Sequence, residues 1–105
     1  MKEKTVIELK EMIDGGVDFQ LIDVREPNEY EICNLKGELI PMGEVPESVG
    51  KISKEKVVVI HCRSGARSGR ICSYLEENHG YTNLYNLRGG ILAWANEIDP
   101  AMPTY

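Results

Sequence analysis

The 105-residue sequence lacks the long hydrophobic runs and the charge pattern that a membrane protein or a secreted protein would need. Its longest clear apolar run, residues 57–60, is far shorter than the roughly 20 residues of a membrane-spanning helix. The first five residues are mostly charged and lead into an amphipathic segment, which is not the pattern of a secretory signal. We therefore expect a cytoplasmic protein with no membrane partner.

Cysteine is also scarce, and its spacing excludes the common frameworks that are built from it. The three cysteines, Cys33, Cys62 and Cys72, are odd in number and lack the Cys-x-x-Cys spacing of zinc and thioredoxin-like sites. In a cytoplasmic protein they are expected to be reduced. We therefore expect no disulfide framework and no metal site, and one reactive thiol becomes the hypothesis to test.

Basic residues are outnumbered, with 12 Lys and Arg against 17 Asp and Glu, a formal net charge of −5. The stretch 56–75 is an exception, because it holds four basic residues and no acidic one: Lys56, Arg63, Arg67 and Arg70. The other 85 residues carry eight basic and 17 acidic side chains, a net charge of −9. An acidic body disfavours polyanions, so we expect no nucleic-acid partner. The basic stretch can attract a small anion, although a helix with a basic solvated face would give the same pattern.

What the sequence does contain is typical of one globular domain. Hydrophobic residues make up 42% and charged residues 28%, and the length suits a single domain, 1–105, with its core at about 5–98. Periodicity predicts helices at 5–14, 27–32, 43–49, 67–78 and 91–98, and strands at 19–24, 39–41, 57–61 and 83–87. This alternation predicts an α/β fold, an open sheet with helices on both faces.

Local signals support several of these boundaries. Thr5 and Glu8 have the spacing of a capping box, Pro27 suits the first turn of a helix, and Gly80 suits a helix end. The strand 57–61 is the strongest prediction, because its aliphatic residues do not alternate with polar ones. Such a strand is buried on both faces, as in the middle of a parallel sheet.

Chemistry is predicted where this strand ends, at Cys62. Ligands bind at the carboxyl ends of strands in open α/β sheets, and the loop after Cys62 is so short that it must curl back over the sulfur. The main-chain N–H groups from Arg63 to Ser68 can then form an anion-binding nest, to which the start of the next helix adds partial positive charge. Gly65 permits the backbone angles that so tight a loop requires.

This arrangement predicts an activated thiol. A thiol with a pKa near 8.5 is only about 3% thiolate at pH 7, whereas one with a pKa near 6.5 is about 75% thiolate. The difference corresponds to about 2.7 kcal/mol of preferential stabilisation of the anion. We expect Arg67 to lie over the loop or to pair at its rim, and Arg63 to face an incoming anionic substrate.

Three motifs occur in order along the chain: LIDVREP at 21–27 with Glu29-Tyr30, CRSGARS at 62–68, and LRGGI at 87–91 with Ala93-Trp94. Together they resemble the rhodanese-like sulfurtransferases, over a match that runs from about Thr5 to Trp94. The sequence NLKGE at 34–38 departs from the His-Ile-Pro-Gly-Ala that the family often has there. Because this segment lies outside the cysteine loop, the departure bears on substrate preference and not on the class of reaction.

The resemblance implies a rhodanese-like fold, a five-stranded parallel sheet flanked by helices on both faces. It also implies that Cys62 is the catalytic residue, which takes sulfane sulfur from thiosulfate or a persulfide donor, becomes a persulfide and passes the sulfur to cyanide or a thiol. A sulfur-relay protein is a further partner consistent with it, and no metal or organic cofactor is needed. The substrate-binding residues implied are those of the loop: Arg63, Ser64, Gly65, Ala66, Arg67 and Ser68.

Two other functions fit parts of the pattern. Phosphatase-like loops of related folds place five residues between the cysteine and the arginine, whereas four stand between Cys62 and Arg67. The shorter loop favours one transferable sulfur atom over a tetrahedral phosphate or arsenate, and so disfavours a phosphatase or an arsenate reductase. A non-catalytic regulatory or docking module is the other alternative, and it is weakened because inactive relatives usually lack the cysteine.

Other conspicuous residues are interpreted as structural. His61 is expected to face away from Cys62, because adjacent residues of a strand point to opposite faces of the sheet. Asp23 and Arg25, with Glu29 four residues on, are expected to form a structural ion pair and not to contact substrate. Core packing is expected for Cys33, Cys72 and Trp94, and a close backbone approach near the active loop for Gly89-Gly90.

Overall fold

The computed structural model describes residues 1–105 and contains one five-stranded sheet, in the order β1-β5-β4-β2-β3. All four neighbouring pairs of strands are parallel. The strands are β1 (Lys2–Lys4), β2 (Phe19–Asp23), β3 (Glu38–Leu39), β4 (Val57–His61) and β5 (Leu84–Leu87). The α/β fold with a five-stranded parallel sheet is therefore confirmed.

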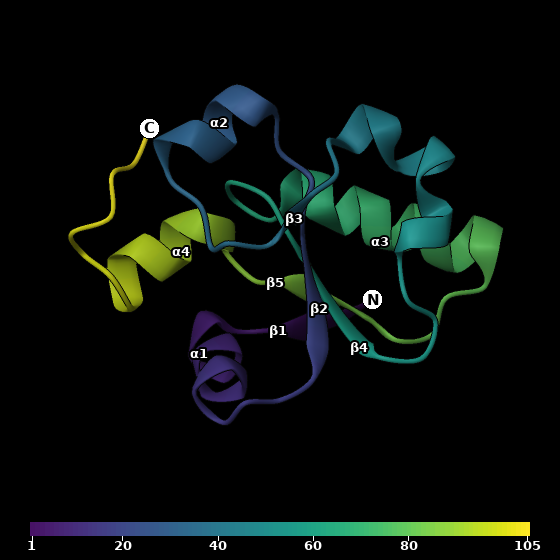
Figure 1. Cartoon of the computed structure of the whole chain (residues 1–105), viewed down its shortest axis with the longest axis horizontal. Coiled ribbons are helices and arrows are strands. Elements are labelled where there is room, and N and C mark those ends of the chain that lie inside the picture. The colour runs from purple at the N-terminus through teal and green to yellow at the C-terminus, as the bar shows by residue number, and fades with distance from the viewer.

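Helices cover both faces of this sheet. They are α1 (Val6–Asp14), α2 (Pro27–Ile32), α3 (Ala66–His79) and α4 (Gly90–Glu97), together with two 3-10 helices, η1 (Met42–Glu47) and η2 (Val49–Lys51). Figure 1 shows α1 and α4 on one side of the strands and α3, η1 and η2 on the other, with α2 beyond the carboxyl end of β2. None of the helices combines the length and the apolar character that a membrane span requires.

The central strand β4 contributes to a hydrophobic cluster on each face, as its unbroken apolar sequence predicted. Val58 and Ile60 belong to the larger cluster, which includes Leu75 of α3. Val59 belongs to the smaller cluster, with Leu9 of α1 and Trp94 of α4. β4 is therefore fixed from both sides, and its carboxyl end is a rigid base for the residues that follow.

Most of the predicted boundaries are close to the observed ones. The capping box of α1 is present, because the Glu8 N–H donates to Thr5 Oγ1 at 3.1 Å and the Thr5 N–H donates to Glu8 Oε1 at 2.9 Å. Pro27 opens α2, and Gly80 ends α3 with a left-handed φ of 67°. These local signals determined the helix ends correctly.

Three predictions need correction. β1 was not predicted, because Lys2–Lys4 is charged throughout, yet it pairs with β5 at the edge of the sheet, where both of its faces need not be buried. The segment predicted as a helix at 43–49 consists of two 3-10 helices, and Pro46, which has no N–H, lies inside the first of them. The strand predicted at 39–41 is only Glu38–Leu39 and ends before Pro41.

Candidate active site

The predicted site lies at the carboxyl end of β4, where Cys62 begins the loop into α3. The first two residues of this loop are fixed to the start of α4, because the Ile91 N–H donates to the Cys62 carbonyl at 3.0 Å and the Leu92 N–H to the Arg63 carbonyl at 3.1 Å. A Cβ atom on Gly90 would lie 2.7 Å from the Cys62 carbonyl oxygen. The close backbone approach predicted for Gly89-Gly90 is therefore confirmed.

Hydrogen-bond donors of the loop point at the Cys62 sulfur. The Gly65 N–H donates to Sγ at 3.1 Å and the Ser68 N–H at 3.5 Å, and Ser68 Oγ lies 3.4 Å from Sγ. Gly65 has a φ of 104°, which confirms the need for glycine at this turn. Cys62 is 1% exposed, so its sulfur is surrounded by protein groups and not by bulk water.

These donors alter the acidity of the thiol. Burial alone raises the pKa of Cys62, but hydrogen bonds from Ser68 and from the N–H groups of Gly65 and Ser64 outweigh burial, and the pKa lies below that of an ordinary thiol. The thiolate, which is the nucleophilic form of cysteine, is therefore favoured here. Cys72 is also buried, but there burial dominates and raises the pKa of the thiol to about 12.

A buried asparagine of β5 completes this arrangement. Asn86 is 4% exposed; its Oδ1 lies 2.5 Å from Ser68 Oγ, and its Nδ2 donates to the Gly65 carbonyl at 3.1 Å. One side chain thus joins the two residues of the loop that bond to the sulfur. The sequence interpretation did not single out Asn86, although a polar residue between the apolar residues of a buried strand was a usable signal.

Arg67 occupies the rim of the loop, one of the two positions expected for it. Its guanidinium donates to both carboxylate oxygens of Glu29 in α2, at 2.7 and 2.8 Å. Arg67 holds the pKa of Glu29 down at about 2, and Glu29 in turn raises the pKa of Arg67. The positive charge of Arg67 is therefore neutralised within the protein. The sequence interpretation placed Glu29 in the ion pair of Arg25, but the Glu29 carboxylate pairs with Arg67, and Arg25 reaches only the main-chain oxygen of Glu29.

Arg63 pairs with no Asp or Glu side chain, and its guanidinium is held by the last residue of the chain, Tyr105. Its Nε donates to the main-chain oxygen of Tyr105 at 2.8 Å, a second N–H donates to the same oxygen, and the guanidinium lies 5.0 Å from the centre of the Tyr105 ring. The Tyr105 hydroxyl donates to Glu29 Oε2 at 2.7 Å and accepts from Arg25 at 2.9 Å. Nothing in the sequence near Tyr105 indicated this position.

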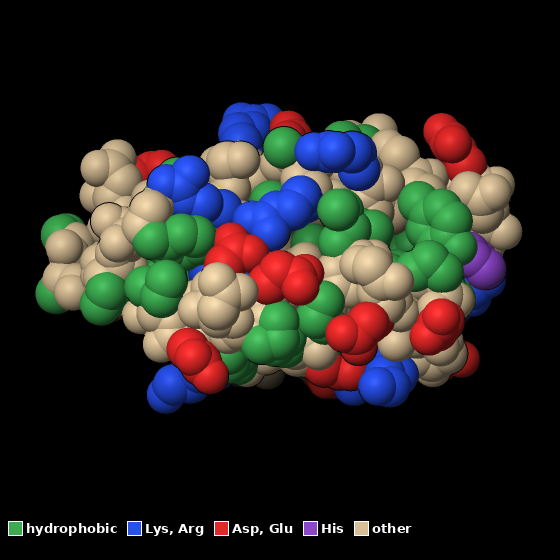
Figure 2. All heavy atoms as spheres, turned by 90° about the horizontal axis from the view of Figure 1, so that it is seen from above, with side chains coloured by type: hydrophobic (Ala, Val, Ile, Leu, Met, Phe, Trp, Pro, Cys, Tyr) green, Lys and Arg blue, Asp and Glu red, His purple; other side chains and the backbone are tan.

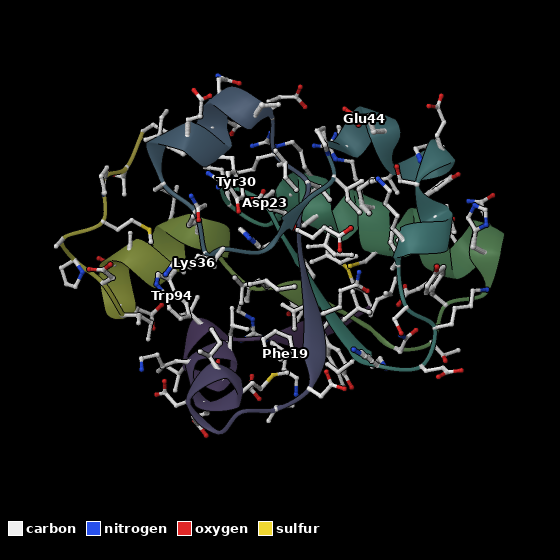
Figure 3. All side chains as sticks on the ribbon, viewed as in Figure 1. Phe19, Asp23, Tyr30, Lys36, Glu44 and Trp94 are labelled. Atoms are coloured by element: carbon white, nitrogen blue, oxygen red, sulfur yellow. The ribbon has the colours of Figure 1, made fainter.

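The structural ion pair next to the site is confirmed. Arg25 and Asp23 are fully buried and 2.7 Å apart, and Figure 3 shows Asp23 at the end of β2. His61 lies on the same side of the sheet, with its Nε2 3.7 Å from Asp23 Oδ2, whereas Cys62 packs in the cluster on the α3 side. Burial lowers the pKa of His61, which is therefore a neutral structural residue that faces away from the sulfur, as predicted.

The remaining residues interpreted as structural are buried. Cys33 and Cys72 are free thiols with 7% and 0% exposure, and Trp94 belongs to the cluster on the α1 side. Figure 3 shows Trp94 on α4, on the side of the sheet that α1 covers. The core roles predicted for these residues are confirmed.

The surface over the site is mixed in charge. Figure 2, which views the molecule from the carboxyl end of the sheet, shows basic and acidic side chains next to each other near the centre of this face. A groove of about 580 Å³ runs from Gly65 and Ala66 along α3, past Arg70. Arg70 and Glu77 both line this groove, and Arg70 makes no hydrogen bond or ion pair within the protein.

Comparisons with known proteins agree with this architecture. The family model described as the rhodanese-like domain matches residues 5–97. A protein named sulfurtransferase from Allochromatium vinosum is 46% identical over 88 residues, which cover 83% of this chain and 81% of the relative. The candidate sulfurtransferase YtwF of Bacillus subtilis is 39% identical over 101 residues, with 95% and 96% covered.

Among solved structures, the crystal structure of a rhodanese-like domain protein from Staphylococcus aureus has a TM-score of 0.82 and 32% identity, and covers 93% of this chain and 95% of that one. Other relatives are much longer. This chain spans 30% of a chloroplast rhodanese-like/PpiC domain protein of Arabidopsis thaliana and 26% of the probable adenylyltransferase/sulfurtransferase MoeZ of Mycobacterium tuberculosis.

Proposed function

Because this chain belongs to the rhodanese-like domain family, we propose that it is a sulfurtransferase that carries sulfane sulfur as a persulfide on Cys62. The observation that supports this most directly is the ring of donors around one sulfur atom, which includes the N–H groups of Gly65 and Ser68. Donors fixed in this way stabilise an anionic sulfur without having to reorganise when it forms. Thiosulfate or a persulfide is the donor proposed.

The first half-reaction loads the sulfur. The Cys62 thiolate attacks the outer sulfur of thiosulfate; the S–S bond of the donor breaks as a new S–S bond forms, and sulfite leaves with the electron pair of the broken bond. The thiolate and the dianionic donor become an anionic persulfide and dianionic sulfite, so charge is conserved. The N–H groups that favour the thiolate are then in place for the negative charge of the persulfide.

The second half-reaction unloads it. An acceptor thiolate, or cyanide, attacks the outer sulfur of the persulfide, and the Cys62 thiolate leaves with the bonding electrons. The products are a persulfide of the acceptor, or thiocyanate, and the enzyme in its starting form. Because the donor leaves before the acceptor reacts, we expect ping-pong kinetics.

The arginines near the loop take different parts in this proposal. Arg63 has no Asp or Glu partner and is held only by the main-chain oxygen of Tyr105, whereas the charge of Arg67 is already neutralised by Glu29. We therefore assign donor binding to Arg63 and a positioning role at the rim to Arg67. The groove beside Gly65, with Arg70 in its wall, is the proposed approach for an anionic acceptor.

The proposal is tested by intact mass spectrometry after treatment with thiosulfate. We expect the native chain to gain the mass of one sulfur atom, and the Cys62→Ser variant to gain none and to form no thiocyanate from thiosulfate and cyanide. Cys72→Ala is the matched control; because Cys72 is fully buried away from the donors, this variant should still gain the sulfur.

Two results would contradict the proposal. The first is a Cys62→Ser variant that keeps more than a few per cent of the native rate of thiocyanate formation. The second is hydrolysis of p-nitrophenyl phosphate by a native protein that forms neither persulfide nor thiocyanate, which would favour phosphatase chemistry instead.

A further inference from the structure

Asn86 is an unusual residue for its position. It lies on β5 opposite Ile60 of β4, on the side of the sheet that α3 covers, and is 4% exposed. Asparagine is depleted in strands, and a buried amide without hydrogen bonds would cost several kcal/mol. An aliphatic side chain would suit the surroundings better, so the amide group calls for an explanation that packing does not supply.

The hydrogen bonds of Asn86 determine which way its amide group is turned. The Gly65 carbonyl, 3.1 Å away, can only accept, so the atom facing it is the NH₂ group of Asn86. The carbonyl oxygen of the amide therefore faces Ser68 Oγ, 2.5 Å away. Because this oxygen carries no hydrogen, the Ser68 hydroxyl must supply the one between them.

Ser68 has only one hydroxyl hydrogen, and two acceptors compete for it. While the hydrogen points at Asn86, the Ser68 oxygen, 3.4 Å from Cys62 Sγ, offers the sulfur a lone pair and can accept a hydrogen bond from the neutral thiol. A thiolate, by contrast, attracts the hydroxyl hydrogen to itself. Asn86 thus competes directly with the thiolate for the same hydrogen.

We infer that Asn86 is a positioning residue, which draws the Ser68 hydroxyl hydrogen away from the Cys62 sulfur and so limits how strongly the thiolate is stabilised. A thiolate with fewer donors is more basic and a better nucleophile, since nucleophilicity falls together with basicity. Asn86 also donates to the carbonyl of Gly65, and the N–H of Gly65 donates to the Cys62 sulfur. Asn86 therefore lowers the fraction of Cys62 that is ionised and raises the nucleophilicity of the thiolate that forms.

Few other groups compete with this effect. Arg67 and Cys72 of α3 interact with Cys62 by charge, and Arg63 is the charged residue next to it in the loop. The ionisable residue of β4 is His61, which faces the opposite side of the sheet. The carboxylates of η1, on Glu44 and Glu47, are exposed. Figure 3 shows Glu44 on η1, at the outer surface of the molecule. None of these groups depends on Asn86 for its position.

The inference deepens the proposed function, but its test needs only the free thiol. The pH midpoint of alkylation of Cys62 by iodoacetamide is measured in the native chain and in Asn86→Val, whose side chain suits a strand and can neither donate nor accept. We expect the midpoint to fall by about one pH unit, because Ser68 can then donate to the thiolate without competition. If Asn86→Val shows this shift but the native chain transfers no sulfur, the result counts against the proposed function alone.

A double-mutant cycle separates this role from a general effect on packing. In the Ser68→Ala background, Asn86→Val should leave the midpoint unchanged, because the hydroxyl that Asn86 controls is gone. Asn83→Val is the matched control, since Asn83 bonds to the Ser53 and Lys56 carbonyls, away from the thiol. An unchanged or raised midpoint in Asn86→Val, or the same shift in both backgrounds, would overturn the inference.

A measurement on the unaltered chain keeps the test valid if Asn86→Val does not fold. The ¹⁵N resonance of the Asn86 side-chain amide is followed by NMR as the pH is varied. We expect this resonance to titrate with the same midpoint as the alkylation of Cys62, because ionisation of the thiol redirects the Ser68 hydrogen. A resonance that does not move across that midpoint would also overturn the inference.

Discussion

Among single residues, Cys62 and Cys72 show how surroundings set the chemistry of a thiol. Both are buried, and burial opposes ionisation of both. At Cys62, hydrogen bonds from the Ser68 hydroxyl and from the N–H groups of Ser68 and Gly65 reverse the direction in which the pKa moves, and at Cys72 burial dominates. The ionisation of a thiol in this protein therefore depends on a few hydrogen-bond donors and not on exposure to solvent.

This contrast predicts selective alkylation. Because the pKa of Cys62 is lowered, iodoacetamide should modify Cys62 with a pH midpoint below the value of about 8.5 for a free cysteine, and the rate should fall as the pH drops through that midpoint. Cys72, with a pKa raised to about 12, should remain unmodified near neutral pH. Mass spectrometry of the separated peptides measures both thiols in one sample. Faster modification of Cys72 than of Cys62 would contradict the prediction.

Among the elements, those with strong local signals were predictable from the sequence. The capping box at Thr5 and the aliphatic run at 57–61 are short-range patterns, and both led to correct elements. β1 escaped prediction because an edge strand next to a long parallel sheet needs no apolar pattern of its own. Its place is determined by pairing with β5, more than 80 residues later in the chain.

The contact between the active loop and the start of α4 yields a prediction at this scale. Gly90 has a φ of 61°, and a Cβ there would meet the carbonyls of both Cys62 and Arg63. Gly90→Ala should therefore destabilise the fold by more than about 2 kcal/mol and reduce sulfur transfer, because the loop must move away.

Chemical unfolding and the transfer assay measure both effects of Gly90→Ala. The control is Gly50→Ala, because a Cβ on Gly50 meets nothing within 4 Å and its φ is not in the left-handed region. This variant should keep the stability and the activity of the native chain. A Gly90→Ala protein as stable as the control would show that the loop tolerates displacement.

Across the whole molecule, the loop around Cys62 could be predicted and the residues that support it could not. The loop is a continuous segment, and its geometry follows from a short connection between a strand and a helix. Glu29, Asn86 and Tyr105 reach it from separations of 18 to 42 residues in the chain. Such contacts depend on how distant elements are placed, which no local pattern in a single sequence reports.

Tyr105 gives a prediction that belongs to the molecule as a whole, since its hydroxyl joins the end of the described chain to Arg25 and Glu29. Tyr105→Phe removes both hydrogen bonds and should lower the free energy of unfolding by about 1 kcal/mol, or the melting temperature by about 4–8 °C. Tyr85→Phe is the control, because the Tyr85 hydroxyl makes no hydrogen bond within the protein. Equal melting temperatures for the two variants would show that the hydrogen bonds of the Tyr105 hydroxyl contribute nothing to the stability of the fold.

If the proposed function holds, the attachment of the Cys62 and Arg63 carbonyls to α4 has a consequence for any partner protein that exchanges sulfur with Cys62. Because both carbonyl oxygens already accept hydrogen bonds from α4, the beginning of the loop has no freedom to rearrange when an atom is added to the sulfur. The form with a free Cys62 and the form that carries the extra sulfur should then have nearly the same surface shape. A partner protein could distinguish the two forms only by contacting the added sulfur atom itself. Sulfur donors and acceptors would both have to approach Cys62 by the same route.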